Sequence, residues 1–104
     1  MLVATIAHLI RRKGTALTGY AIELFDAWLA DAGFRLGSPR EAERRGSHVS
    51  LLRADAEDLT RSLIASGVVP DFRPPDGIRL GLSPLTTRFT DVWDGLSRLR
   101  QMVG

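Results

Sequence analysis

The residue best suited to bind a ligand is Arg79, in the segment Ile78-Arg79-Leu80-Gly81-Leu82. A planar guanidinium offers two parallel donors to a carboxylate, whereas lysine offers only a point charge. If the segment is a strand, alternation places its aliphatic side chains on one face, and Arg79 and Gly81 on the other. A glycine there leaves room for a ligand beside the arginine. The pattern therefore indicates either a carboxylate-binding site or an arginine on a solvated sheet face.

His48 is the next candidate, because imidazole titrates near neutral pH. The second histidine, His8, is expected on a different element, so a metal site is not favoured, and a structural role on a strand is the ordinary interpretation. Cysteine is absent, which excludes disulfides, thiol nucleophiles and thiolate metal sites. The sequence also lacks a glycine-rich phosphate loop and a helical His-Glu-x-x-His motif. No motif for independent catalysis remains.

Other charged and aromatic residues have simpler interpretations. Basic residues cluster at 11–13 and 40–45, but acidic residues interrupt the second stretch, and neither has an aromatic platform for bases. With a net charge of only +2, we expect solvated surfaces and no nucleic-acid binding. Asp71 and Arg73 could position a substrate, although residues beside a turn more typically hold a hairpin together.

The longest element predicted is an amphipathic helix over residues 3–32. Its apolar residues recur at spacings of three and four, and Gly33 supplies a stop. Gly14 and Gly19 each weaken it by about 1 kcal/mol relative to alanine, so a bend or fray is expected there. Trp28 is expected to pack in the core or an interface. Residues 35–46 have no apolar period and predict a loop.

Alternation predicts a strand over 47–52 and an antiparallel hairpin formed by 68–72 and 78–82. In the turn between them, proline fixes one dihedral angle and Gly77 permits a positive φ.

Two more helices complete the predicted elements. Asp55 is expected to cap a helix that ends at Gly67 and buries Leu59, Leu63 and Ile64. The last helix spans 89–103, with Trp93 on its apolar stripe and Thr87 or Thr90 as its cap.

These elements predict an α+β fold with one core, in which helices cover a small three-stranded antiparallel sheet behind a long N-terminal helix. That helix is about 45 Å long, too long for the sheet to cover. Part of its apolar stripe should contact a missing domain or a second copy. Neither a signal peptide nor a membrane span is expected, so a soluble, cytoplasmic protein is predicted.

Three stretches carry a resemblance to a known family. RGSHVSL (45–51), GVVPDFRPPDGIRLGLSPL (67–85) and FTDVWDGLSRLR (89–100) resemble, in order and spacing, the C-terminal part of bacterial kynureninases. RRKGTALTGYAIELFDAWL (11–29) resembles the helix that links the large and small domains in that family. The resemblance implies a linker helix at 1–33, which joins a missing large domain, and a small C-terminal α+β domain at 34–104.

Family membership would imply a fold type I, aminotransferase-like hydrolase of tryptophan catabolism. Such enzymes are homodimers that use pyridoxal phosphate to convert kynurenine to anthranilate and alanine. The cofactor lysine and phosphate-binding residues of the family lie upstream of this region, so we expect no cofactor on this chain alone and no catalysis by it. Lys13, the single lysine, has no flanking motif for a Schiff base. Arg79 matches the arginine that binds the substrate's α-carboxylate.

The chain departs from the family pattern in two places. Ala54-Asp55 stands where many kynureninases have His-Pro, which exchanges one helix start for another. Pro84-Leu85-Thr86 stands where they have Pro-Leu-Tyr, which removes an aromatic ring near Arg79 and bears on substrate choice. The competing hypothesis is an orphaned, non-catalytic binding module that self-associates through its long helix.

Overall fold

The computed structural model describes residues 2–104, with side chains from Ala4 onward. Three α-helices and four strands make up the fold, and two short 3-10 helices lie before and after the first strand. In chain order the elements are α1 (Leu2–Trp28), η1 (Ala30–Ala32), β1 (Arg35–Leu36), η2 (Ala42–Arg44), β2 (His48–Leu52), α2 (Ala56–Ala65), β3 (Asp71–Arg73), β4 (Gly77–Gly81) and α3 (Phe89–Val103).

The strands form one antiparallel sheet in the order β1-β2-β4-β3. The α+β class is confirmed, but the sheet has four strands where three were predicted. The extra strand, β1, lies in the segment predicted as a loop. Only two residues pair there. The contact continues where the Gly37 N–H donates to the Ser50 carbonyl and the Ser38 hydroxyl accepts from the Ser50 N–H. So short a pairing depends on the neighbouring strand and leaves no periodic signal in the sequence.

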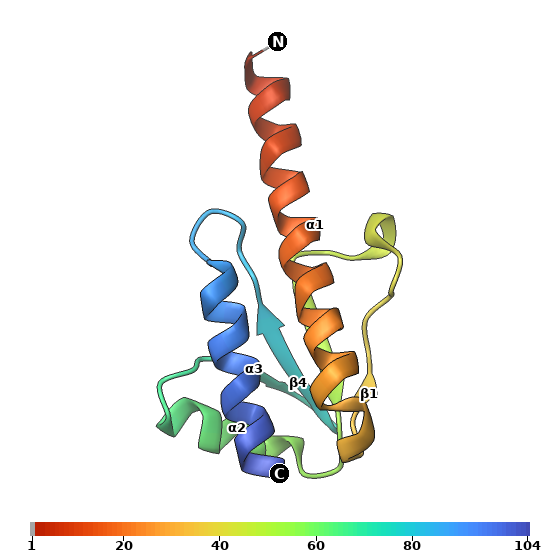
Figure 1. Ribbon diagram of the computed structural model, residues 1–104, viewed down its shortest axis with the longest axis vertical. Helices are drawn as coiled ribbons and strands as arrows, with labels where there is room; N and C mark the ends of the chain where they lie inside the picture. The colour runs from red at the N-terminus through yellow and green to blue at the C-terminus, as the bar shows by residue number, and fades with distance from the viewer. Residues whose placement is uncertain (1) are drawn as a thin grey trace.

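All three helices lie on one side of the sheet, and α1 and α3 run side by side in front of it (Figure 1). The covered face carries Val49, Leu51 and Ile78, whose side chains have no exposed surface. These residues join the buried stripes of the helices in one hydrophobic cluster. The opposite face of the sheet, which includes Arg79, is therefore left without a helix over it.

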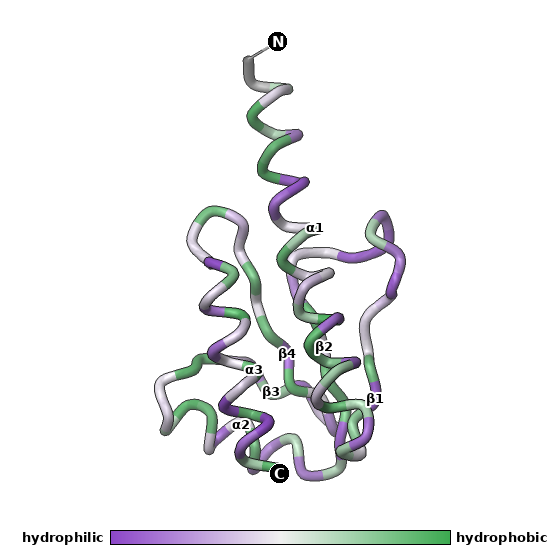
Figure 2. The backbone as a smooth tube through the Cα atoms, viewed as in Figure 1, coloured by the Kyte–Doolittle hydropathy of each residue, from purple (hydrophilic) through white to green (hydrophobic). Residues whose placement is uncertain are grey.

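Helix α1 is buried along its second half and exposed along its first. Leu17, Ala21 and Phe25 belong to the core, whereas Ile6 is 48% and Leu9 55% exposed. The N-terminal turns extend beyond the rest of the molecule (Figure 2). The prediction that the sheet cannot cover the whole apolar stripe of this helix is thus confirmed.

The interior and the C-terminal end of α1 both differ from the prediction. The helix continues through Gly14 and Gly19 without the expected fraying. It ends at Trp28, earlier than predicted, and one 3-10 turn leads to Gly33, whose φ of +86° makes it the predicted stop.

The segment between β1 and β2 is attached to α1, although its arginines were interpreted as solvated. Arg40 binds Asp26 through two hydrogen bonds of 2.9 Å each. The hydrogen bond from Arg40 lowers the pKa of the Asp26 carboxyl below its ordinary value. Arg45 donates to the Thr18 hydroxyl at 3.0 Å and to the Thr15 carbonyl at 3.1 Å.

The starts of the two shorter helices also differ from the prediction. Arg88, and not a threonine, occupies the N-cap of α3, where the Asp91 carboxylate accepts a hydrogen bond of 2.8 Å from the Arg88 main chain. Asp55 lies at the N-cap of α2 without a side-chain capping bond and pairs with Arg53. In α2, Ile64 is 51% exposed, because the buried positions at 56, 59, 60 and 63 turn it away from the core.

Gly77 serves a different purpose from the one predicted. Its φ is not positive, and positive values occur within residues 2–104 only at Gly33 and Gly67. A Cβ atom at position 77 would lie 3.0 Å from the carbonyl oxygen of Arg73, its partner across the β3–β4 pair. Glycine is therefore favoured here, because the close approach of two main chains would crowd a side chain.

Along residues 2–104, no helix has the length and apolar character that crossing a membrane demands.

Candidate carboxylate-binding site

Arg79 lies in the middle of β4, on the sheet face without helices. Its neighbours in the chain are Ile78, which is fully buried on the other face, and Leu80, which is half-buried there. The predicted alternation is confirmed, because burial of the aliphatic residues forces Arg79 to the open side. Arg79 pairs with Ser50 of β2 and with Asp71 of β3. The local sequence thus fixes the face on which the guanidinium lies.

The side chain of Arg79 is 31% exposed and forms an ion pair across the strands. Its Nη2 atom donates to Oδ2 of Asp71 at 3.1 Å. Arg73 approaches the same carboxylate oxygen at 3.5 Å. Asp71 and Arg73 therefore contribute contacts within the hairpin, as predicted. The Asp71 side chain is itself 64% exposed, so this ion pair lies at the surface and not inside the core.

Arg79 lines an open, polar hollow with a volume of about 470 Å³. The hollow is bounded by the ends of β2 and β4, the segment before β3, and the loop that leads to α3. Its lining residues are Ser47, His48, Val69, Asp71, Arg79, Gly81, Leu82, Ser83, Thr86 and Thr87. The guanidinium, the imidazole and the hydroxyl groups can all donate hydrogen bonds, which suits an anionic, oxygen-rich ligand.

Some of these residues were expected near Arg79 and others were not. Gly81 leaves open space beside the arginine, as predicted, because a Cβ atom placed there meets nothing within 4 Å. Thr86, where the sequence resemblance implies a tyrosine in the family, lines the same hollow. Ser47, Ser83 and Thr87 were missed, because isolated hydroxyl residues at strand and helix ends carry no spacing signal.

His48 lines the hollow as well, opposite Gly81 in the β2–β4 pair. Its side chain is exposed, whereas Val49 and Leu51 are buried as the strand pattern predicted. His8 lies on the exposed half of α1. Among residues 2–104, no cluster of three histidine, cysteine, aspartate or glutamate residues could hold a metal ion.

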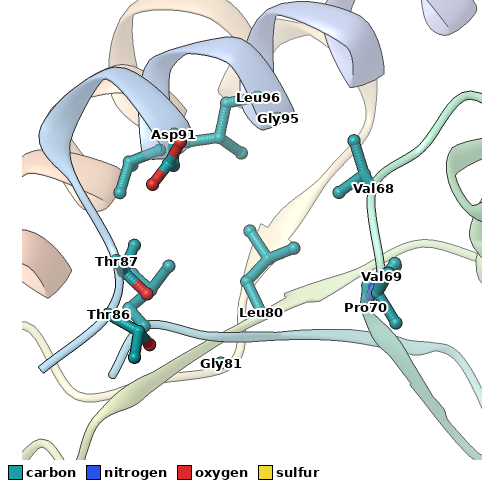
Figure 3. A pocket seen from close by; sticks show the side chains of 12 residues that line it. Val68, Val69, Pro70, Leu80, Gly81, Thr86, Thr87, Asp91, Gly95 and Leu96 are labelled. Carbon is teal, nitrogen blue, oxygen red and sulfur yellow. The ribbon is translucent and has the colours of Figure 1, made fainter. Parts of the chain in front are cut away.

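A second, apolar pocket of about 200 Å³ adjoins the hollow on the helical side of the sheet. Figure 3 shows Leu80, Val68 and Leu96 around it, with Thr86 and Thr87 at one side. Both cavities share residues at the end of β4 and in the following loop. Sequence reasoning missed this pocket because it assigned 68–70 to a strand, whereas β3 begins only at Asp71.

The two tryptophans and the single lysine lie away from the hollow. Trp28 and Trp93 pack edge to face at 5.6 Å between α1 and α3, as expected of packing residues, and Trp93 stays exposed on its outer side. Lys13, the only lysine, lies on α1 and lines neither the hollow nor the apolar pocket. The described residues therefore do not fit pyridoxal phosphate, which needs a lysine facing its binding pocket.

Comparison with known proteins identifies the family. Residues 10–99 match the family described as the kynureninase C-terminal domain. A kynureninase of Bacillus thuringiensis subsp. konkukian is 38% identical over 94 residues, which cover 90% of this chain and 22% of the relative. A kynureninase of Burkholderia mallei is 39% identical over 99 residues, which cover 95% of this chain and 24% of the relative. The chain thus spans less than a quarter of these relatives, and it belongs to the kynureninase C-terminal domain family.

Proposed function

We propose that this chain is the substrate-closing domain of a kynureninase-type hydrolase, and that Arg79 binds the α-carboxylate of kynurenine. The observation that carries the proposal is the position of Arg79 on the open face of the sheet, at the wall of a polar hollow. Asp71 occupies one N–H group of its guanidinium, and other N–H groups stay available for a carboxylate. Binding at this point would orient the substrate and hold it in the cleft between two domains.

The remaining machinery would be supplied by a large domain, since the relatives are more than four times as long as the matched segment. Such a domain would carry the pyridoxal phosphate and its lysine. Residues 1–33 would link it to the small domain at 34–104. The exposed Ile6 and Leu9 on α1 are suited to pack against it or against a second copy in a homodimer. A cytoplasmic location is part of the same proposal.

Two experiments test this function. The chain alone, mixed with pyridoxal phosphate and kynurenine, should give neither an imine absorbance band nor anthranilate fluorescence. A chimera in which the chain replaces the matching C-terminal segment of the Bacillus thuringiensis kynureninase should form anthranilate. A chimera that folds and binds the cofactor but forms no anthranilate would contradict the proposal, as would robust turnover by the chain alone.

A second candidate function, a non-catalytic module that self-associates, is favoured by the same exposed residues of α1. It predicts a stable dimer or higher oligomer of the chain alone, measurable by light scattering. A strict monomer that binds the remainder of a kynureninase would favour the enzyme domain instead.

A further inference from the structure

We infer that Asp71 is a positioning residue, which holds the Arg79 guanidinium in the orientation that binds a carboxylate. The inference rests on the proposed function, because it assigns a role within the same site. Asp71 and Arg79 are direct partners in the β3–β4 pair, and Oδ2 of Asp71 accepts a hydrogen bond of 3.1 Å from Nη2. Directly opposed strand residues on one face lie close enough for this bond to fix the long arginine side chain.

The single bond leaves a complete bidentate edge on the guanidinium. One N–H group of Nη2 lies parallel to the N–H of Nε, and the other lies parallel to an N–H of Nη1. Asp71 therefore engages one edge, and a ligand carboxylate can use the other. Within residues 2–104, the side chain of Arg79 makes no further hydrogen bond that would occupy this second edge.

A carboxylate next to an anion site would repel the ligand unless its charge were compensated. Arg73 supplies this compensation. Its Nη2 atom lies 3.5 Å from the same Oδ2 of Asp71, because residues two apart in a strand share a face. The group formed by Asp71, Arg73 and Arg79 thus keeps an excess of positive charge while Arg79 is held in place.

Asp71 could act by orienting Arg79 or only through its own negative charge. Two anions of different shape distinguish these effects. A planar carboxylate gains from two parallel N–H donors, whereas a chloride ion responds mainly to charge. If Asp71 orients Arg79, its removal should weaken the preference for carboxylate over chloride, even though the site becomes more positive. If Asp71 acts only through its charge, its removal should strengthen the binding of both anions.

The test uses the ¹⁵N-labelled full chain and the side-chain Nε–H signal of Arg79, which is assigned by its loss in Arg79→Lys. Sodium benzoate and sodium chloride are titrated separately, at matched concentrations in a zwitterionic buffer. We expect benzoate to shift the signal at several-fold lower concentration than chloride. The ratio of the chloride concentration to the benzoate concentration at half-maximal shift measures the selectivity. Asp71→Ala should lower this ratio several-fold, whereas Asp71→Asn, which keeps an oxygen acceptor, should retain most of it. Asp71→Ser is a second truncation, and circular dichroism checks that each variant is folded.

Asp76→Ala is the matched control. It removes the carboxylate that pairs with Arg35 at 3.0 Å and changes the net charge equally. This variant should keep the wild-type ratio. An unchanged ratio in the Asp71 truncations, or an equal loss in the control, would overturn the inference. Absence of any benzoate shift in the wild type would overturn both the inference and the assignment of Arg79. An inactive chimera with a carboxylate-selective Arg79 would contradict the proposed function alone.

Discussion

Leu51 and Ile78 face each other across the β2–β4 pair, and neither side chain has any exposed surface. Their contact fixes which face of β4 is buried, so it also determines that Arg79, the next residue, lies on the open face. Burial of Ile78 in the core therefore determines the position of its chain neighbour Arg79 in the candidate site.

Truncation of Leu51, one member of this pair, should lower the stability of the fold substantially. Leu51→Ala leaves a cavity in a fully buried position and is expected to lower the free energy of unfolding by about 2–5 kcal/mol. Urea denaturation followed by circular dichroism measures the change. Ile64→Ala is the matched control, because Ile64 is half exposed, and it should change the free energy by less than about 1 kcal/mol. Similar losses of unfolding free energy in both variants would contradict the burial of Leu51 in the core.

The contribution of the first turn of α3 to the stability of the fold should depend on pH through Asp91. The hydrogen bonds from the Arg88 side chain and main chain lower the pKa of Asp91 below its ordinary value of 3.8. A carboxyl whose pKa is lower in the folded state stabilises the fold above its unfolded pKa, and this contribution is lost as pH falls through the folded value. Asp91→Asn should therefore be less stable than the wild type at neutral pH, and the difference should shrink below pH 3.8.

Urea midpoints measured at neutral and acidic pH check this expectation. Asp94→Asn is the control, since Asp94 makes an exposed ion pair with Arg98 within the same helix, and such pairs contribute little. A difference between the wild type and Asp91→Asn that stays constant across the pH range would contradict the capping role of the carboxylate.

The exposed half of α1 should be dispensable for folding but needed for association. Ile6→Ser combined with Leu9→Ser should leave the melting temperature nearly unchanged, because neither side chain belongs to the core. The same variant should bind more weakly to the remainder of the Bacillus kynureninase, as measured by calorimetry, or should lose self-association in light scattering. Leu17→Ala, on the buried half of the helix, should instead lower the melting temperature. Unchanged association in both assays would exclude this surface as an interface.

The sequence predicted those parts of the fold that depend on local periodicity. The apolar spacing of α1, α2 and α3 and the alternation around Arg79 each follow from burial of one face, so their existence could be predicted. Strand β1 and the bonds from Arg45 to α1 depend on contacts between distant residues, which no local pattern records. In the site, Arg79 could be predicted from its guanidinium group and its place between alternating aliphatic residues. The hydroxyl groups around it became neighbours only through the fold.

Arg79→Lys in the active chimera is the most direct probe of the candidate site. Lysine keeps the positive charge but loses the two parallel donors, so the substrate carboxylate should bind with a single contact. Loss of a charged hydrogen bond of this kind costs about 1.5–3 kcal/mol, which corresponds to a fall in kcat/KM of roughly 10- to 150-fold. Steady-state anthranilate fluorescence measures it. Arg35→Lys, a surface arginine paired with Asp76 on the same sheet, should leave kcat/KM unchanged. Equal effects of the two substitutions would mean that Arg79 does not contact the substrate.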